Sequence, residues 1–173
     1  WAVAAQAVYG RRIAKAQVAF EVEHWERDYT NNGQSFRDYD ADELKLTVFY
    51  NLGPKTQLLV EPSYTDYDYP NSAQDNDVMR ILAGVTWEAT AKTTGEFKIG
   101  RHEKEFDTGE SQDGLSMEGR IIWKPKSYST VTGSVSRYVY DSAIGGGSLS
   151  YEASIVNLDW VHELTALTEL QAG

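Results

Sequence analysis

Residues 78–106, VMRILAGVTWEATAKTTGEFKIGRHEKEF, decide the fold that the sequence predicts. In the first half, one face carries Met79, Ile81, Ala83, Val85 and Trp87, and the other carries Arg80, Leu82, Gly84 and Thr86. After a polar turn, Phe97 and Ile99 share one face, while Glu96, Lys98 and His102 share the other. Because strand side chains alternate between two faces, the stretch predicts a β-hairpin with one apolar and one polar face.

Such a hairpin fits either a soluble sheet, which buries its apolar face, or a membrane-spanning sheet, which turns that face to lipid. Strands of roughly ten residues match the length of a tilted strand that crosses the hydrocarbon core. Trp87 lies at the turn end of the apolar row, where an interfacial aromatic girdle is expected. Length and the position of Trp87 therefore favour a transmembrane hairpin.

Composition narrows the class of protein. The chain has 173 residues, of which 41% are hydrophobic and 12% aromatic, and its mean hydropathy is -0.49. No apolar run approaches the roughly 18 to 20 residues of a membrane helix, so a helical membrane protein is excluded. The absence of cysteine excludes disulfides, thiolate metal sites and cysteine nucleophiles.

The net charge of the chain and the residues at its two ends each lead to an expectation. The net charge of -10 argues against nucleic acid as a partner, because phosphate backbones are bound by clustered Lys and Arg. The sequence begins at Trp1 and stops at Gly173 within an apparent strand. We therefore expect a segment of a longer protein.

Along the chain the same hairpin recurs. Tyr50, Trp87, Trp123 and Trp160 end successive strands at spacings of 37, 36 and 37 residues. The pattern predicts about ten strands in a single domain over residues 1–173, or in a segment of one, built of hairpin repeats of about 37 residues. The predicted fold is an all-β, antiparallel, up-and-down transmembrane β-barrel, or part of a larger one.

The connections are expected to differ at the two ends of the strands. Short turns fall at one end, and loops of about ten or more residues fall at the other, as in bacterial outer-membrane barrels. The polar tracts Glu26 to Glu43 and Tyr64 to Asp77 are interpreted as such loops. Pro62 predicts a bulge or local break, and a change of apolar phase predicts a bulge near Ile155.

The alternation also assigns residues to faces. The expected outward set carries no charge: Val18, Phe20, Leu46, Val48, Leu58, Val60, Ile81, Ala83, Phe97, Ile99, Ile121, Val131 and Val135. The candidate pore-lining set is polar: Glu21, Glu23, Lys45, Glu61, Arg80, Glu96, Lys98, Glu118, Arg120, Thr132 and Ser134. The candidate aromatic girdle is Tyr50, Trp87, Trp123 and Trp160. A charge-free outward face is what lipid requires, although a soluble core gives a similar division.

Two turn segments carry a resemblance to a known family. Residues 84–95, GVTWEATAKTTG, and residues 123–130, WKPKSYST, resemble hairpin turns of the putative beta-barrel porin 2 family. The resemblance covers most of the chain and implies an outer-membrane barrel associated with exopolysaccharide secretion. The chain is shorter than a family barrel and lacks a terminal aromatic strand, which fits a partial chain.

No catalytic or metal site is expected. His24, His102 and His162 lie on separate hairpins without metal-ligand spacing, and no G-x-S-x-G motif occurs. The carboxylates of Asp66, Asp68, Asp75 and Asp77 are interpreted as a solvated acidic loop rather than a calcium site. We expect no enzyme activity, no metal and no cofactor.

Tyrosines near the loop ends are candidates for stacking on sugar rings, with an aromatic girdle and loop packing as the alternative. The candidate sugar-contacting aromatics are Tyr64, Tyr67, Tyr69, Tyr138 and Tyr140, and Tyr29 and Tyr39 belong to the same pattern.

Together these features predict a pore in the outer membrane of a Gram-negative bacterium that passes hydrophilic solutes or, as the resemblance implies, exports exopolysaccharide. Expected partners are membrane lipid and lipopolysaccharide, the exopolysaccharide itself, and a periplasmic export partner. The alternatives are a soluble or surface β-sheet protein that binds glycan, and an adhesive barrel with a plugged lumen.

Overall fold

The computed structural model describes the chain except residues 12–13, 31–32, 34, 73, 142–149 and 166–167, and except the side chains of residues 140, 141 and 150. One short 3-10 helix, η1 (Ser35–Arg37), precedes the third of ten strands. The strands are β1 (Ala2–Tyr9), β2 (Ala16–Arg27), β3 (Tyr39–Gly53), β4 (Thr56–Asp68), β5 (Asn76–Thr90), β6 (Thr93–Phe106), β7 (Ser111–Lys126), β8 (Ser129–Asp141), β9 (Ser150–Thr165) and β10 (Thr168–Ala172).

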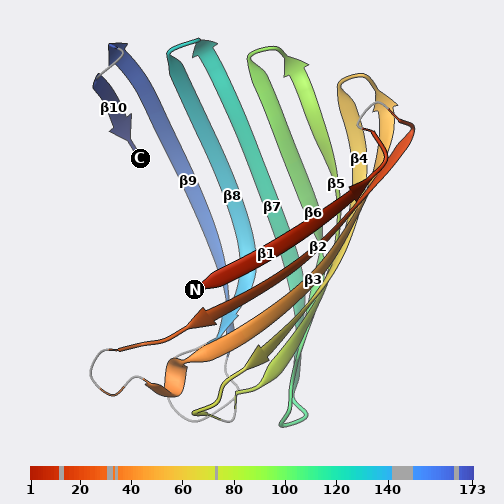
Figure 1. Cartoon of the computed structure of the whole chain (residues 1–173), viewed down its shortest axis with the longest axis vertical. Coiled ribbons are helices and arrows are strands. Elements are labelled where there is room, and N and C mark those ends of the chain that lie inside the picture. The colour runs from red at the N-terminus through yellow and green to blue at the C-terminus, as the bar shows by residue number, and fades with distance from the viewer. Residues whose placement is uncertain (12–13, 31–32, 34, 73, 142–149, 166–167) are drawn as a thin grey trace.

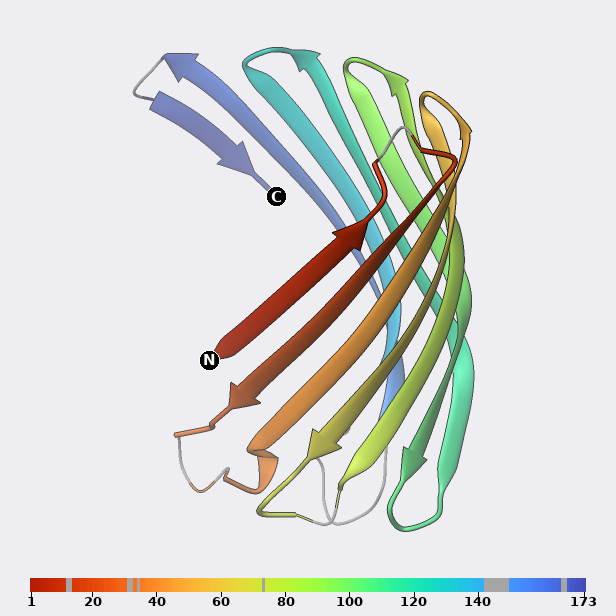
Figure 2. The ribbon, with the colours of Figure 1, turned by 45° about the vertical axis from the view of Figure 1, so that its right-hand side comes forward.

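All ten strands form one antiparallel sheet in which each strand pairs with its neighbours in sequence, from β1 to β10. The sheet curls into a deep trough, with β1 and β10 on its two sides (Figures 1 and 2). Among the described residues no ladder joins β1 to β10, so the sheet is open. Within the same residues, no helix is long and apolar enough to span a membrane. The predicted up-and-down antiparallel fold of about ten strands is confirmed.

The connections differ at the two ends of the strands, but less than the sequence predicted. Tight turns join β3 to β4, β5 to β6 and β7 to β8 at the upper end in Figure 1. At the other end, β6 and β7 are joined by residues 107–110 alone, and β4 and β5 by residues 69–75. The expected loops of ten or more residues are therefore wrong at these two places, because the strands extend further than their apolar pattern.

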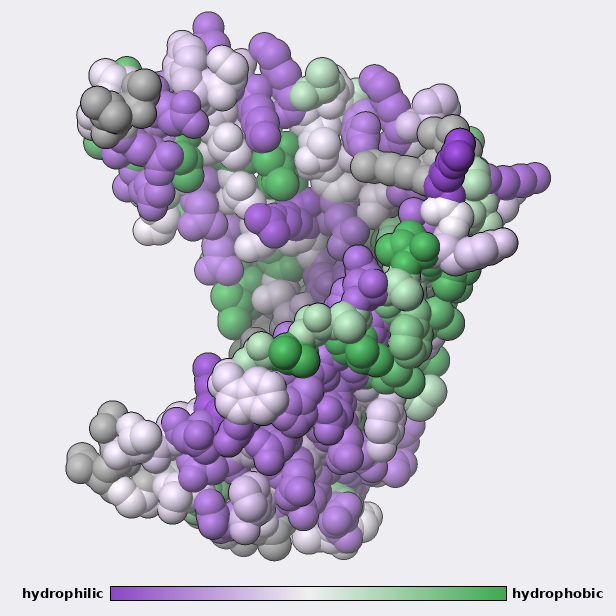
Figure 3. Space-filling model, in the orientation of Figure 1, coloured by the Kyte–Doolittle hydropathy of each residue, from purple (hydrophilic) through white to green (hydrophobic). Residues whose placement is uncertain are grey.

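The convex face carries an apolar belt. Its central row follows the strand register from Val18 through Val48, Val60, Ala83 and Ile99 to Met117. These side chains have no covering layer, and Val60 is 49% exposed. In Figure 3 a hydrophobic band crosses the middle of the molecule over β1 to β3, and hydrophilic residues cover the end where the longer connections lie. A continuous exposed apolar surface of this kind marks a site of contact with lipid or another apolar partner.

The concave face is polar and more closely packed. Residues that face it include Glu61, Lys98 and Ser116, all of which are buried. Leu82 is completely buried at its centre, and its register partner is Gly100. A Cβ at Gly100 would lie 1.9 Å from the carbonyl oxygen of Ile81, so only glycine permits this approach of β5 and β6.

The two predicted irregularities have different outcomes. At Pro62 the ladder between β3 and β4 lacks the pairs between Lys45–Ser63 and Val48–Val60, while the register on either side is unchanged. Pro62 therefore makes a local break without a bulge. The predicted bulge near Ile155 is wrong, because β8 and β9 pair in one continuous register. Tyr151, Ala153 and Ile155 instead face the concave side.

A row of acidic residues ends the belt on the convex face. The register aligns Asp42, Asp66, Asp77 and Glu105 across four adjacent strands. Like charges directly opposite each other destabilise a sheet. Burial raises the pKa of Asp66, and the neighbouring Asp77 carboxylate raises it further. Asp66 and Asp77 thus lie within strands, and the interpretation of residues 64–77 as one acidic loop is wrong.

We predict that Asp66→Asn raises the midpoint of thermal unfolding at neutral pH. The folded protein resists ionisation of Asp66 more than the unfolded chain does, so the ionised carboxylate lowers stability above its folded-state pKa. The gain should disappear as the pH falls below the ordinary value of 3.8, where both states are protonated. Circular dichroism melts in detergent measure it. Asp107→Asn, outside the row, is the control, and an equal gain there would contradict the prediction.

Candidate functional site

A chain of ion pairs crosses the concave face. Lys45 pairs with Glu21 at 2.5 Å and with Glu43 at 3.7 Å, and Arg80 lies 3.6 Å from Glu43. Arg80 continues to Glu118 at 3.1 Å. The network therefore connects β2, β3, β5 and β7 without interruption.

Lys98 extends this ion-pair network to two further strands. Its Nζ lies 2.5 Å from Glu118 and 2.9 Å from Glu61, with Glu96 at 3.7 Å. The Thr47 hydroxyl donates to Glu61 at 3.1 Å. The carboxylates of Glu61 and Glu118 thus share one buried cation, which offsets part of the cost of removing all three charges from water.

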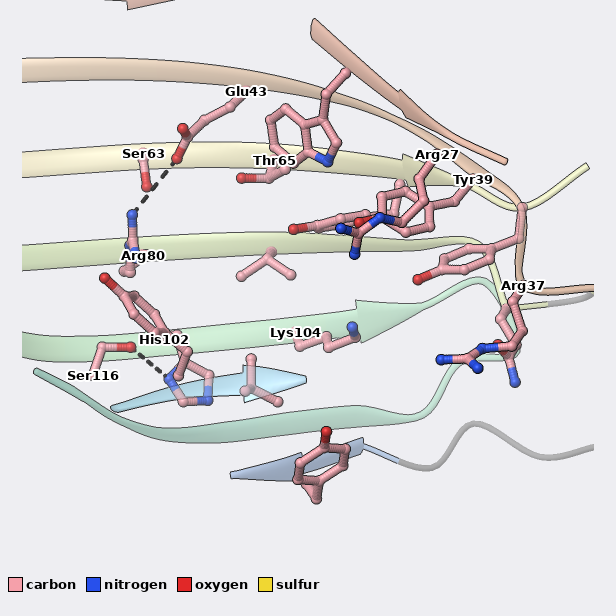
Figure 4. A pocket seen from close by; sticks show the side chains of 18 of the residues that line it. Arg27, Arg37, Tyr39, Glu43, Ser63, Thr65, Arg80, His102, Lys104 and Ser116 are labelled. Atoms are coloured by element: carbon pink, nitrogen blue, oxygen red, sulfur yellow. Dashed lines mark hydrogen bonds and ion pairs between the residues drawn. The ribbon is translucent and has the colours of Figure 1, made fainter. Parts of the chain in front are cut away.

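A cavity of about 540 Å³ opens on the concave face between the ion-pair network and the longer connections. Side chains from β2, β3, β5, β6 and β7 point into it, and Arg37 reaches it from η1 (Figure 4). Its volume lies in the range of small-molecule sites. We refer to it as the basic-aromatic pocket, because cationic and aromatic residues dominate its lining.

The aromatic wall of the basic-aromatic pocket is a connected cluster. The ring of Trp25 lies 6.0 Å from that of Tyr67, edge to face. Tyr39 lies 5.7 Å from Tyr67 and 5.4 Å from Tyr69. These spacings are those of favourable aromatic pairs, so the cluster fixes the wall across β2, β3 and β4.

The cations of the basic-aromatic pocket lie close to aromatic rings. Arg37 is 4.5 Å from the centre of the Tyr29 ring, and Arg80 is 5.3 Å from that of Tyr138. Lys104 is 5.5 Å from the Tyr67 ring and only 2% exposed. Each contact falls within the range of a cation–π interaction.

His102 lies beside Ser116 at the border of the pocket. Its Nδ1 is 2.8 Å from the Ser116 hydroxyl, as Figure 4 shows. Its Nε2 is buried and has no hydrogen-bond partner among the described residues. The ring is therefore held in place while one polar atom stays unsatisfied.

The structure places every candidate pore-lining residue on the concave face, as the alternation predicted. Glu21, Lys45, Glu61, Arg80, Glu96, Lys98 and Glu118 belong to the ion-pair network. Glu23, Arg120, Thr132 and Ser134 lie on the same face outside it, by register.

The candidate girdle residues Tyr50, Trp87, Trp123 and Trp160 all lie on the convex face beside the tight turns. The Trp87 ring covers Gly95, where a Cβ would lie 2.3 Å from it. The Trp160 indole donates to the Ser129 hydroxyl at 3.0 Å. The four residues therefore share one face and one end of the sheet, and their role as an interfacial girdle stays a prediction.

The candidate sugar-contacting tyrosines do not all lie in one place. Tyr67, Tyr69 and Tyr138 line the basic-aromatic pocket. Tyr64 does not, because it lies within β4 on the convex face, where its hydroxyl donates to Asp77 at 2.5 Å. The side chain of Tyr140 lies outside the described residues.

Sequence reasoning missed several pocket residues. Arg27 and Glu43 fall within the tract interpreted as a loop but belong to β2 and β3, and Trp25, which the sequence left unassigned, also belongs to β2. The signal was present, because all three continue the period-two alternation of Glu21 and Lys45. Lys104 continues it from Lys98 in the same way.

No group of three or more His, Cys, Asp or Glu that could hold a metal ion occurs among the described residues. His24 lies 2.8 Å from Asp42 on the convex face, far in sequence from the His102–Ser116 pair.

An antiparallel sheet with an exposed apolar belt on its convex face, a polar concave face and aromatic residues at its rim is the architecture of a transmembrane β-barrel. A family model described as putative beta-barrel porin 2 matches residues 2–170. The chain belongs to this family, as its turns predicted.

Among solved structures, the chain is similar to OmpT (in-vitro folded), an outer membrane protein of Vibrio cholerae, with a TM-score of 0.55 and 15% identity. The match covers 92% of this chain and 53% of that one, so the chain spans about half of its length. A search of curated protein sequences finds no match. The family and the fold point to the outer membrane and to a porin-like role.

We predict that Lys98→Met lowers the free energy of unfolding by about 1–3 kcal/mol, because Glu61 and Glu118 lose a charged hydrogen-bond partner. Urea titration in detergent measures the change. Adding Glu61→Gln should restore part of the loss, because one orphaned charge disappears. Lys55→Met, at an exposed turn, is the control. Wild-type stability in Lys98→Met would show that the ion-pair network contributes nothing.

Proposed function

We propose that this chain forms part of the wall of an outer-membrane pore that passes hydrophilic solutes, including exopolysaccharide. The observation that carries the proposal is the division of one sheet into a convex face with an exposed apolar belt and a concave face lined with charge and hydroxyl groups. Passage through such a lumen needs no chemistry from the protein, and we propose no catalytic role.

The apolar belt favours the membrane over the alternative of a soluble glycan-binding sheet. In a soluble protein, residues such as Val60 and Ile81 would be covered by a second layer. Here they are 49% exposed and lie beside a rim of tryptophans. In this proposal membrane lipid covers the belt, and lipopolysaccharide lies at the level of the acidic row.

The ion-pair network supports a wet lumen of mixed charge. Three cations and five carboxylates line one side of it, and the concave hydroxyls of Thr132 and Ser134 can exchange hydrogen bonds with a passing sugar. The sheet is open, and the chain spans about half of its structural neighbour. We therefore also propose that further strands complete the lumen and that a periplasmic partner delivers the polymer to it.

Single-channel recording tests the proposal. Purified protein inserted into a planar bilayer in potassium chloride should give stepwise currents. Thr132→Trp, on the concave face, should reduce the conductance, because the indole enters the lumen. Val131→Trp, the neighbouring residue on the convex face, is the matched control and should leave it unchanged. If correctly folded and inserted protein carries no current, the proposed pore function is wrong.

The orientation of the faces has its own test. Val60→Arg should make folding into lipid vesicles less favourable by about 2–4 kcal/mol, because it places a charge in the middle of the belt. Folding yield against urea concentration measures the change. Thr132→Arg adds the same charge to the concave face and should have a much smaller effect. Equal effects at both positions would refute the assignment.

A further inference from the structure

The basic-aromatic pocket is positively charged in a chain whose net charge is -10. Its lining includes Arg27, Arg37, Arg80 and Lys104, and among the described lining residues Glu43 alone carries a carboxylate. Glu43 is already shared by Arg80 and Lys45. The pocket is therefore a local site for an anion, set apart from the acidic row on the opposite face.

The aromatic wall beside these charges suits a ring with an apolar face and hydroxyl groups. Trp25, Tyr39, Tyr67 and Tyr69 offer flat apolar surfaces, and the tyrosines add phenolic hydroxyls at their edges. The C–H faces of a sugar ring pack on such surfaces, while its hydroxyls bond to the edges. The chemistry is that of a saccharide site.

The cationic side chains of the pocket lie close to its aromatic rings. Arg37 lies 4.5 Å from the Tyr29 ring, and Lys104 lies 5.5 Å from the Tyr67 ring. A ligand ring stacked on the aromatic cluster would carry its substituents past these cations. A carboxylate on that ring matches the fork of an arginine and the ammonium of a lysine.

His102 provides an independent sign of a ligand. It is 1% exposed and lines the pocket, and its Nε2 has no hydrogen-bond partner among the residues that the structure describes. A buried polar atom without a partner is costly, and a ligand hydroxyl would satisfy it.

We propose that the basic-aromatic pocket binds an acidic saccharide, a chain of sugar rings that carry carboxylates, as it passes through the lumen. This inference deepens the proposed pore function. The passage of the saccharide through the lumen rests on that function, whereas its binding in the pocket does not. Arg27, Arg37 and Lys104 pair with the carboxylates, and the aromatic cluster holds the rings.

A single-stranded nucleic acid also combines charge with stackable rings, but it fits less well. Such ligands are bound along an extended basic groove that follows many phosphates. Here the cationic excess is confined to one cavity of about 540 Å³, and carboxylates dominate the ion-pair network beside it. The saccharide therefore fits both the charge and the size.

Isothermal titration of the detergent-solubilised protein tests the proposal with an oligogalacturonate of six sugars as the probe. Maltohexaose, of equal length and without charge, and an oligothymidylate of six nucleotides are the comparison ligands. We expect the oligogalacturonate to bind at least about tenfold more tightly than either, and its affinity to fall with added salt. Equal binding of maltohexaose, tighter binding of the oligothymidylate, or no binding of the acidic sugar overturns the proposal.

Variants assign the binding to the pocket. Arg37→Gln and Lys104→Gln should each weaken it about tenfold, the loss expected for one charged hydrogen bond. Lys104→Arg should restore the affinity, which also guards against a folding defect in the buried position. Arg101→Gln removes a cation from the opposite face of the same strand, β6, and should change nothing. A loss at Arg101 as large as at Arg37 refutes the site.

Conductance separates this inference from the pore itself. In a bilayer, oligogalacturonate should reduce the potassium chloride current, and Arg37→Gln should relieve the block. An open pore that the acidic sugar neither binds nor blocks overturns the pocket and leaves the pore standing. Protein that binds the acidic sugar but carries no current would support the pocket and overturn the pore.

Discussion

The structure depends on the register of one sheet whose two faces must meet opposite environments. Because the side-chain period is two, the pairs that align Val18, Val48 and Val60 on the convex face also bring Lys45, Arg80 and Lys98 to their carboxylates on the concave face. A slip of one residue between two neighbouring strands from β2 to β7 would place charge in the apolar belt and would also break the ion-pair network. Two independent penalties therefore enforce the same register.

The ion-pair network and the basic-aromatic pocket divide the concave face between support and recognition. In the network, each cation is shared by carboxylates from more than one strand, so its charges are used within the protein. In the pocket, cations lie against aromatic rings and outnumber the carboxylates. Arg80 belongs to both, because it pairs with Glu118 of the network and lies over the ring of Tyr138 in the pocket.

The fold and the two faces could be predicted from alternation because the belt makes apolar and polar positions differ sharply. The strand ends could not, since hydrogen bonding continues beyond the belt while the hydrophobic contrast stops. Trp25 and Arg27 extend β2 in this way, and Tyr64 falls on the opposite face from Tyr67 because their positions differ by an odd number. Near Ile155 both faces of β9 carry apolar residues, with Ile155 on the concave face and Val156 on the convex face. In the sequence this looks like a shift of the apolar residues from one face to the other. The pocket needed the three-dimensional structure, because its residues come from all the strands from β2 to β9 and from η1.

The distribution of the five tryptophans has a practical consequence. Trp87, Trp123 and Trp160 lie on the convex face near the tight turns, and Trp1 lies exposed at the start of β1. Trp25 stands apart, in the concave pocket and in contact with Tyr67. Quenchers carried by lipid chains and quenchers dissolved in water should therefore reach different indoles. Intrinsic fluorescence can follow the wall and the interior of this sheet separately, without an added label.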